Sequence, residues 1–328
     1  MSKLVSILIP AYNAEKWIKD TIESALGQTW QNKEIIIADD GSTDGTLAIA
    51  KSFEGPSVKV VTQENKGASA ARNKALSLAQ GDYIQWLDAD DLLAPSKIAL
   101  QMANPQDGNF SKTLLSSSFA TFYYRLEKAK SRTSALWRDL TPIEYFYIKF
   151  NQRAWMSPSV WLVSRKLTEL AGPWDERLSL DDDGEYFSRV VTVCDGIKFI
   201  PEAKVFYRQC NTGSLSRRIN DKAYYSLFLS RSLCIGYMKR LEDSDRIRNT
   251  CLKCLQDLYI LYYPEKVEFV KKIQRIAQEL GGNLLPPRLK WNYSIIKNIL
   301  GWKITKRLYF SMPKLKVLLM KNFDMLVP

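Results

Sequence analysis

Short apolar runs and amphipathic segments alternate along the first hundred residues. Four runs have the length and character of buried strands: residues 5–10, 34–38, 58–61 and 83–87. The segments between them have helical spacing: residues 13–26, where Asn13 is the expected N-cap, a segment that ends near residue 52, and residues 67–79. Because parallel strands are normally joined through a helix, this alternation predicts an α/β fold with a parallel, doubly wound sheet.

Beyond residue 100 the pattern becomes less regular and then helical. Further strands are expected at residues 116–126, 157–163 and 198–208, with helices starting at residue 142 and spanning residues 183–194. Three later segments have helical periodicity: residues 219–241, 245–261 and 265–280. We therefore expect an α/β domain over residues 1–218, with halves at 1–98 and 99–218, followed by a helical region over residues 219–328.

Polar side chains gather where the predicted strands end. Tyr12 and Asn13 follow the first strand, Asp39 and Asp40 follow the second, and residues 88–91 follow the fourth. Ligands of doubly wound sheets bind at the carboxyl ends of the strands. The sequence therefore predicts a ligand site at this edge of the sheet.

The chain has 328 residues and no histidine. This absence excludes hydrolases that use a Ser-His or Cys-His pair, and it excludes metal sites with histidine ligands. No two glycines have the spacing of GxGxxG and no glycine precedes a lysine, so the dinucleotide fingerprint and the Walker A loop are absent as well. A bound diphosphate would therefore depend on a metal ion or on Lys and Arg side chains.

Asp88-Ala89-Asp90 supplies the metal alternative, since both carboxylates follow the fourth predicted strand. Hard oxygen ligands suit Mg²⁺ or Mn²⁺, which keep coordination positions for water and phosphate oxygens. Such an ion would neutralise charge on a departing diphosphate. Because no histidine can add a ligand, we expect the metal to bind weakly when no diphosphate is present.

Four blocks in order resemble the family 2 glycosyltransferases of the GT-A fold. They are residues 5–13 (VSILIPAYN), 37–44 (IADDGSTD), 65–73 (NKGASAARN) and 87–91 (LDADD). The close match covers about residues 3–98, and a looser one continues to about residue 215.

The resemblance implies a mixed, mainly parallel sheet flanked by helices, with a nucleotide-binding first half and an acceptor-binding second half. It also implies inverting transfer of a sugar from a nucleotide-sugar, with a UDP-sugar favoured. The acceptor would be a hydroxyl of a polysaccharide, a lipid-linked sugar or another glycoconjugate.

The resemblance assigns base recognition to the ends of the first two strands. Pro10, Ala11 and Tyr12 would line the base pocket, with Tyr12 packed against a uracil-type ring. Asp40 would accept the imide N–H of the base, while Asp39 would be the more structural of the two carboxylates.

The remaining donor contacts implied by the resemblance come from the third and fourth blocks. Arg72 would contact the nucleotide, and nearby Lys66 could serve the same anion. Asp88 would reach the ribose or assist the metal, and Asp90 would ligate Mn²⁺ or Mg²⁺ directly.

The resemblance places the catalytic base in the run from Asp181 to Asp183. Aligning the family's arginine with Arg189 puts Asp183 at the base, and Asp182 at a position more often held by Glu. Asp183 also leads the apolar stripe of the predicted helix, which would turn it toward the cleft. The choice among Asp181, Asp182 and Asp183 stays open, as does a purely structural role in which acidic residues stabilise the helix N-terminus.

Three further residues are candidates for acceptor or diphosphate contacts: Asp182, Arg208 and Trp155. Arg208 lies in residues 207–216 (YRQCNTGSLS), which resemble the end of the family's catalytic domain, although a histidine often found there is absent. An ordinary strand end is the equal alternative for Arg208. Trp155 and Trp174 could stack on sugar faces, but core packing is the preferred interpretation for each.

The basic excess of the chain is concentrated at its C-terminal end. Lys and Arg number 47 against 35 Asp and Glu, and residues 283–328 hold nine basic residues and one acidic residue. Aromatic residues among these cations suit an anionic membrane surface, while a helical cap packed on the catalytic domain is the alternative. No nucleic-acid-binding module is recognisable, so a nucleic-acid partner is not expected.

The five cysteines and the absence of a signal peptide predict a cytoplasmic protein, which would be peripheral on the inner face of the cytoplasmic membrane if residues 283–328 bind lipid. Cys251 and Cys254 form a CxxC without a second pair, which favours two buried thiols over a zinc site. A non-catalytic nucleotide-sugar or polymer-binding module of the same fold is the alternative function. It is disfavoured because the chain has every expected carboxylate: Asp40, Asp88, Asp90 and Asp183.

Overall fold

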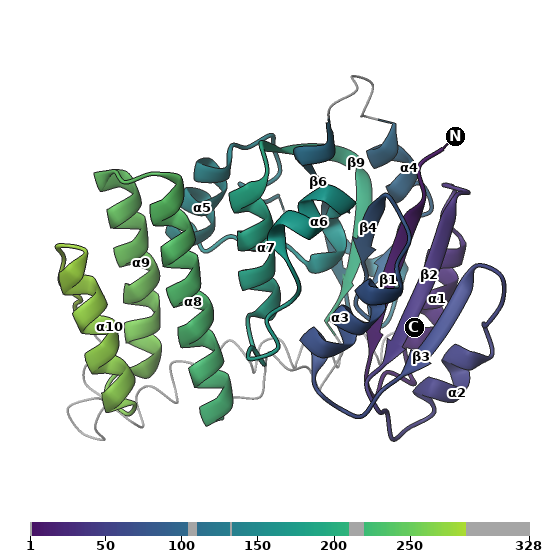
Figure 1. The fold of residues 1–328 in the computed structure, drawn as a ribbon, viewed down its shortest axis with the longest axis horizontal. Helices are drawn as coiled ribbons and strands as arrows, with labels where there is room; N and C mark the ends of the chain where they lie inside the picture. Colours follow the sequence, from purple (N-terminus) through teal and green to yellow (C-terminus); the bar gives the residue numbers. More distant parts are fainter. Residues whose placement is uncertain (1, 104–109, 132, 210–219, 287–328) are drawn as a thin grey trace.

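The computed structural model describes residues 2–103, 110–131, 133–209 and 220–286. In these residues one mixed sheet is flanked by helices, and further helices extend to one side of it (Figure 1). The strand order is β3-β2-β1-β4-β8-β6-β9-β5, with β7 paired to β6.

The first half of the sheet is parallel. Its strands are β1 (Val5–Ala11), β2 (Lys33–Asp39), β3 (Val58–Thr62) and β4 (Tyr83–Trp86). The core positions of β1 and β2 are fully buried, as expected for strands covered on both faces. Helices α1 (Ile18–Leu26), α2 (Thr46–Lys51) and α3 (Ala68–Leu78) follow β1, β2 and β3. The predicted alternation of strands and helices is confirmed here.

The second half makes the sheet mixed. Strand β8 (Leu162–Ser164) runs antiparallel to β4 and to β6 (Thr113–Phe122), while β9 (Gly196–Arg208) is parallel to β6. Two short strands, β5 (Leu92–Leu93) and β7 (Lys130–Ser131), add antiparallel pairs to β9 and β6. The remaining elements of this half are α4 (Lys97–Met102), α5 (Pro142–Asn151), α6 (Arg165–Ala171), α7 (Asp182–Val193), and the 3₁₀ turns η1 (Phe110–Lys112), η2 (Leu126–Lys128) and η3 (Pro158–Val160).

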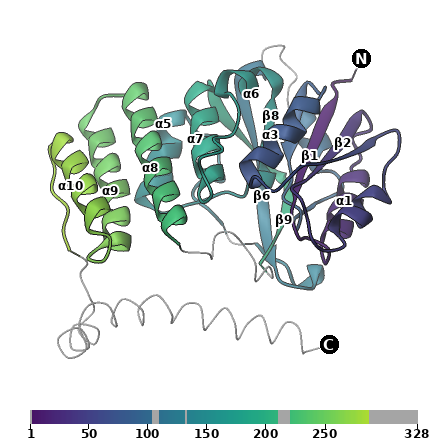
Figure 2. The same cartoon turned by 60° about the horizontal axis from the view of Figure 1, so that its bottom comes forward.

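The helical region consists of α8 (Asp221–Leu241), α9 (Asp245–Tyr262) and α10 (Val267–Glu279). Helix α8 packs on α7, α9 packs on α8 and α5, and α10 packs on α9 (Figure 2). Ser244 and Asn220 begin α9 and α8 as N-caps, with side chains that accept hydrogen bonds from backbone amides. The helical region therefore contacts the rest of the structure mainly through α5 and α7.

One local prediction is wrong and a second is confirmed only in part. Asn13 does not cap the first helix, which begins at Ile18 after Trp17; Asn13 has a φ of 48° and its Oδ1 accepts a hydrogen bond from the amide of Thr43. The strand expected at residues 157–163 is present only at its end, where β8 begins at Leu162, because residues 158–160 form a 3₁₀ turn that the Ser157 hydroxyl caps before Pro158. In both places a polar side chain satisfies a nearby backbone amide in a loop geometry that apolar periodicity does not report.

An aromatic cluster anchors α7 against the end of β4. Trp174 stacks on Tyr186 with ring centroids 4.0 Å apart, and Trp86 meets both rings edge-on. All three side chains are buried, so the expected core role of Trp174 is confirmed. This packing holds the N-terminal turn of α7 near the carboxyl end of β4.

Cys251 and Cys254 are buried free thiols on α9, as the CxxC interpretation predicted. In the described parts of the chain, no helix is both long and apolar enough to span a bilayer. The predicted membrane contact of residues 283–328 falls outside the described residues except for 283–286, as does most of the 207–216 motif.

Candidate active site

The carboxyl ends of β1 and β2 lie side by side. Ala11 pairs with Asp39, and the amide of Asp40 donates to the carbonyl oxygen of Ala11 at 2.8 Å. Tyr12, the next residue after β1, exposes 45% of its surface, while Pro10 is half-buried. This edge therefore presents an open aromatic ring next to two buried carboxylates.

Asp40 is buried and fixes the loop that leads into α3. Its Oδ1 accepts hydrogen bonds from Gln63 Nε2 at 2.8 Å and from the Lys66 amide at 2.9 Å, and its Oδ2 accepts one from the Gly67 amide at 2.8 Å. Gly67 has a φ of 99°, a conformation that glycine adopts without a Cβ clash. The Lys66 side chain is exposed. A base imide would have to share the Asp40 carboxylate with these protein donors.

Asp39 has one carboxylate oxygen engaged and one free of protein donors. Its Oδ2 accepts hydrogen bonds from the Ser42 amide at 3.2 Å and from Thr62 Oγ1 at 3.0 Å. Its Oδ1 is buried and has no hydrogen-bond partner among the described residues. A buried acceptor without a donor is unfavourable, so Asp39 is a second acceptor that a ligand donor could satisfy. The sequence prediction treated this residue as structural.

The loop after β4 separates two half-buried carboxylates from one that is fully buried. Asp88 and Asp90 are partly accessible, whereas Asp91 has no exposed surface. Asp91 Oδ2 accepts hydrogen bonds from the hydroxyls of Ser157 and Ser159, each at 3.1 Å. Burial and the charges of Asp90 and Asp88 raise the pKa of Asp91 well above its usual value. Asp91 thus anchors the loop, a role that its sequence position did not reveal.

Arg208 holds the same loop from β9. Its amide donates to Asp91 Oδ1 at 3.0 Å, and its Nε donates to the Asp90 carbonyl oxygen at 2.9 Å. The guanidinium carbon lies 4.5 Å from the ring centroids of both Trp17 and Phe122. Because Arg208 is buried and held by these groups, the structure supports a positioning role in addition to the predicted diphosphate or acceptor contact.

Arg72 joins the two halves of the site. Its Nη2 donates to Asp88 Oδ1 at 2.9 Å and its Nη1 donates to Asp182 Oδ2 at 2.6 Å. The guanidinium also lies 4.3 Å above the Trp174 ring. Burial opposes the charge, but Asp182 and Asp88 raise the pKa of Arg72 above its usual value. Arg72 therefore connects the loop after β4 to the first turn of α7. The sequence had predicted that this side chain contacts the nucleotide directly.

The structure gives the three aspartates at the start of α7 different surroundings. Asp181, with a φ of 61°, accepts hydrogen bonds from the Ser230 hydroxyl at 2.6 Å and from Arg231 Nη2 at 3.3 Å. Asp182 is bound to Arg72. Asp183 Oδ1 accepts a hydrogen bond from the Gly184 amide at 2.8 Å, and no basic side chain in the described chain forms an ion pair with it.

Burial is the main cause that raises the pKa of Asp183 to about 7, and the charges of Asp182 and Asp181 add to it. A carboxylate that titrates near neutrality is suited to accept a proton at physiological pH. The tight packing of this turn requires glycine at position 184, because a Cβ there would lie 2.3 Å from Asp181 Oδ1.

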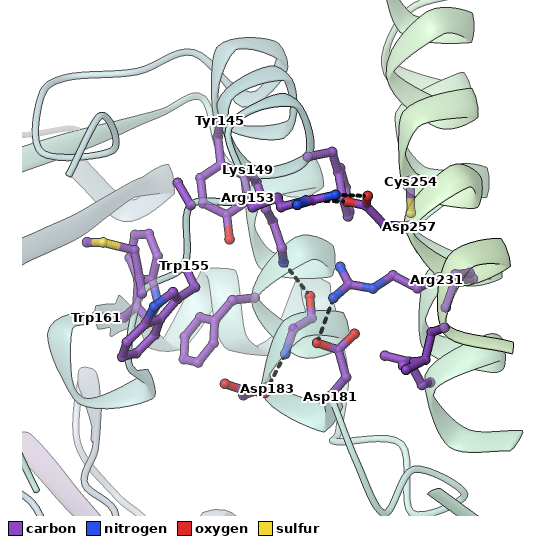
Figure 3. Close-up of a pocket in the computed structure, with 18 residues that line it drawn as sticks. Tyr145, Lys149, Arg153, Trp155, Trp161, Asp181, Asp183, Arg231, Cys254 and Asp257 are labelled. Carbon is purple, nitrogen blue, oxygen red and sulfur yellow. Dashed lines mark hydrogen bonds and ion pairs between the residues drawn. The ribbon is translucent and has the colours of Figure 1, made fainter. Parts of the chain in front are cut away.

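Asp183 lines a cavity of about 310 Å³ between the α/β domain and the helical region (Figure 3). The lining comes from α5, α7, α8 and α9, from residues 153–156, and from Trp161 and Asp181. Trp155 is at this cavity with 47% of its surface exposed, so the preferred core role of Trp155 is wrong. Its ring lies 5.0 Å from Phe119 and 5.2 Å from Tyr207.

Comparisons with known proteins agree with this architecture. The model of the family described as "Glycosyl transferase family 2" matches residues 6–168. Glycosyltransferase GlyG of Streptococcus pneumoniae serotype 4 is 28% identical over 301 residues, which cover 85% of this chain and 90% of GlyG. WfgD of Escherichia coli, named as a UDP-Glc:α-D-GlcNAc-diphosphoundecaprenol β-1,3-glucosyltransferase, is 41% identical over 109 residues, covering 33% of this chain and 43% of WfgD.

The crystal structure of Staphylococcus aureus TarS 1–349 in complex with UDP-GlcNAc has the same fold. It superposes with a TM-score of 0.58 at 18% identity, covering 84% of this chain and 87% of that one. A mixed sheet with acidic residues gathered at its strand ends, together with these matches, shows a GT-A fold. The chain belongs to glycosyl transferase family 2 and is a glycosyltransferase.

Proposed function

We propose that this glycosyltransferase moves a sugar from a UDP-sugar to a hydroxyl of a saccharide or lipid-linked acceptor, with inversion and with Asp183 as the base. The observation that carries this proposal is the position of Asp183. It faces a cavity, its pKa is raised to about 7, and its neighbour Asp182 is tied through Arg72 to Asp88. Donor and acceptor sides of a transfer reaction would thus meet at the N-terminus of α7.

UDP is supported as the donor nucleotide by two similar proteins, since WfgD is named for UDP-Glc and the TarS structure is a complex with UDP-GlcNAc. The edge formed by β1 and β2 suits a base. Tyr12 offers an exposed ring for stacking, Pro10 and Ala11 precede it at the end of β1, and Asp40 and Asp39 offer acceptor oxygens. Lys66, with an exposed side chain, would attract the diphosphate.

The carboxylates after β4 fit Mn²⁺ or Mg²⁺. Asp88 and Asp90 are hard oxygen ligands two residues apart. Because the described residues contain no group of three or more potential protein ligands, water and diphosphate oxygens would have to complete the coordination of the ion. Asp88 already accepts a hydrogen bond from Arg72, so Asp90 would be the principal ligand and Asp88 the assisting one. When bound, the ion supplies positive charge to the leaving diphosphate.

The residues of the chain account for the proton transfer. Asp183, deprotonated, would take the proton of the acceptor hydroxyl as that oxygen attacks the anomeric carbon, and a positioned base contributes about 10²–10⁴-fold. Arg72 keeps Asp182 and Asp88 in place, and the Trp174–Tyr186 stack fixes the start of α7. A single displacement of this kind requires no covalent enzyme intermediate.

We extend the proposal to the domain organisation. Residues 1–218 form the catalytic domain, with a nucleotide-binding half (1–98) and an acceptor-binding half (99–218), and residues 219–328 form the helical region. Support comes from the distribution of site residues, because the candidate donor contacts precede residue 98 and Asp183 follows it.

Whether residues 283–328 bind an anionic membrane is tested by co-sedimentation with anionic liposomes, comparing the full chain with a chain that ends at residue 282.

The Asp90→Ala variant tests the donor side of the proposal. Screening UDP-sugars with Mn²⁺ should identify a donor from which the wild-type protein releases UDP, and EDTA should stop the release. Because Asp90 would be a direct metal ligand, its loss should lower turnover by more than about 100-fold. The exposed Asp243→Ala variant is the control and should match the wild type. UDP release that is independent of metal and of Asp90 would contradict the metal assignment.

The Arg208→Met variant tests how the metal loop is positioned. Loss of the Nε hydrogen bond to the Asp90 carbonyl should let the loop move, which should raise the Mn²⁺ concentration for half-maximal UDP release by about 10–100-fold. Arg240→Met removes another arginine that lies over an aromatic ring, Tyr237, and serves as the matched control. An unchanged Mn²⁺ dependence of the Arg208 variant would show that the loop keeps its geometry without this side chain.

A further inference from the structure

We propose that the cavity between the α/β domain and the helical region binds the acceptor as an uncharged sugar, with Trp155 as its aromatic platform. The inference rests on the proposed function, since it takes Asp183 as the base. It adds the position of the acceptor, its charge class, and a role for α8 and α9 in selecting it. The family match, which ends at residue 168, assigns nothing to these helices.

The cavity adjoins the proposed reaction centre. Asp183 belongs to its lining, and in Figure 3 the labelled side chains of Trp155 and Trp161 lie on one side and that of Arg231 on the other. Trp155 contacts Tyr207, and Tyr207 is close enough to the carboxylates after β4 that their charges, with burial as the main cause, raise its pKa. A ring seated at Trp155 would therefore lie near Asp183 and near the donor side.

The charges of the lining are balanced and largely paired with one another. Three basic and three acidic residues line the cavity: Lys149, Arg153, Arg231, Asp181, Asp183 and Asp257. Arg153 forms a bidentate ion pair with Asp257, with N···O distances of 2.6 and 3.1 Å, and Arg231 forms an ion pair with Asp181 at 3.3 Å. An anionic acceptor group would have to break one of these pairs.

Lys149 is also committed to the protein. Its Nζ donates to the Gly184 carbonyl oxygen at 2.9 Å and to Ser188 Oγ at 3.0 Å, and it lies above the rings of Tyr145 and Phe150. Among the described lining residues, this leaves Asp183 as the carboxylate outside any ion pair, and its task is to accept a hydroxyl proton. The lining is therefore matched to hydroxyl groups and not to a phosphate or carboxylate.

The rest of the lining is apolar, which suits the C–H faces of a sugar ring. Trp155 has 47% of its surface exposed, and the helical region adds apolar lining residues: Leu227, Cys254, Leu258 and Leu261. Small-ligand sites combine such apolar walls with a few placed polar groups, and about 310 Å³ is at the lower end of their range. A single sugar unit or a short saccharide end fits this description better than a long buried chain.

The helical region also holds the base in place. Ser226 Oγ on α8 accepts hydrogen bonds from the amides of Ser179 and Leu180, each at 2.9 Å, and Ser230 on the same helix donates to Asp181. The segment that delivers Asp183 is thus fastened to α8. One helix therefore contributes both to the acceptor wall and to the position of the proton acceptor.

Ligand-observed NMR of the full chain with UDP and Mn²⁺ tests the site without requiring turnover. The probes are methyl glucoside, methyl galactoside and methyl N-acetylglucosaminide, with methyl glucuronide as the anionic match of the glucoside. At least one neutral glycoside should bind, and it should bind about tenfold more tightly than methyl glucuronide, the anionic probe. Octyl glucoside distinguishes the source, since tighter binding than the methyl glycoside points to a lipid-borne sugar and equal binding to a free saccharide.

Three variants locate the probe. Trp155→Ala should weaken neutral glycoside binding by about tenfold and Trp155→Phe should restore most of it. Leu227→Trp, which fills the cavity from α8, should abolish binding, whereas Leu170→Trp, at an exposed position of α6, is the matched control. Asp257→Asn removes the carboxylate that neutralises Arg153, so it should improve glucuronide binding relative to the glucoside.

Preference of the wild type for glucuronide, absence of neutral glycoside binding, or normal binding by both Trp155→Ala and folded Leu227→Trp would overturn the proposal. Thermal melting separates folded from unfolded variants. Failure of the proposed function is distinguishable, because it would show as no UDP release from any donor while glycoside binding still responds to these substitutions.

Discussion

Replacing Asp183 by asparagine is expected to lower sugar transfer by about 10²–10⁴-fold and, at pH 8, to make the protein more stable. Asparagine keeps the shape of the side chain but cannot take the acceptor proton. It also removes a partly buried charge that lies near two other carboxylates, Asp181 and Asp182. Loss of activity together with a gain in stability is expected where a site maintains an unfavourable charge for its chemistry.

The sign of the stability change follows from the pKa of Asp183, which is raised to about 7 in the folded chain. An aspartate in an unfolded chain has a pKa of about 3.9. Between these values the folded state binds more protons, so the stability of the wild type falls as pH rises from about 4 toward 7. Above that range both states are charged and the full penalty is present. The asparagine variant lacks this dependence, so its advantage should be absent at pH 4 and greatest at pH 8.

Two measurements check this expectation. Melting temperatures of the variant and wild type at pH 4, 6 and 8 should diverge with rising pH, by at least about 2 °C at pH 8. In the wild type, kcat/KM should increase with pH through about 7, since the base must be deprotonated in the free enzyme. Asp195→Asn, an exposed position just after α7, is the control for both measurements. Wild-type transfer by the Asp183 variant would remove this residue as the base.

Replacing Arg72 by methionine is expected to cost about 3–5 kcal/mol in the free energy of unfolding, because it leaves partly buried carboxylates without their cation. Asp88 and Asp182 would then repel each other across the centre of the site. The stacking of the guanidinium on Trp174 would be lost as well. Transfer should fall together with stability, since the loop after β4 and the first turn of α7 would no longer be joined.

Urea unfolding measures this effect, and an exposed arginine–aspartate pair provides a control of matched chemistry. Arg177 binds Asp175 at 2.6 Å but has 64% of its side chain exposed, so Arg177→Met should cost no more than about 1 kcal/mol. Adding Asp182→Asn to Arg72→Met should recover part of the lost stability by removing one unpaired charge. Similar losses for Arg72→Met and Arg177→Met would contradict the bridging role.

The apolar periodicity of the chain was sufficient for the regular elements. Strands β1 to β4 and helices α7 to α10 lie within a few residues of their predicted positions, because buried strands and amphipathic helices have patterns that are local in sequence. The short elements β5, α4 and α6 were missed. Their few residues carry too little periodicity, and α6 depends on a cap, in which the Ser164 side chain accepts a hydrogen bond from the Leu167 amide.

The same distinction between local and distant interactions applies to the candidate site. The motifs predicted which carboxylates gather at the strand ends, and Asp183 was the favoured base from its alignment with Arg189. The surroundings of those carboxylates could not be predicted, because their partners are far away in sequence. Asp182 meets Arg72 across 110 positions, Arg208 meets Asp91 across 117, and Asp181 meets Arg231 across 50.

By itself the sequence determined the fold class, the family resemblance and the set of acidic residues available for chemistry in a chain without histidine. Only the tertiary structure decided what each of these residues faces. Trp155 and Trp174 are the same residue type, yet one is exposed at a cavity and the other is stacked in the core. The physical reason is that burial, charge pairing and pKa depend on neighbours brought together by packing, and helices α8 and α9 reach the base only after the chain has folded.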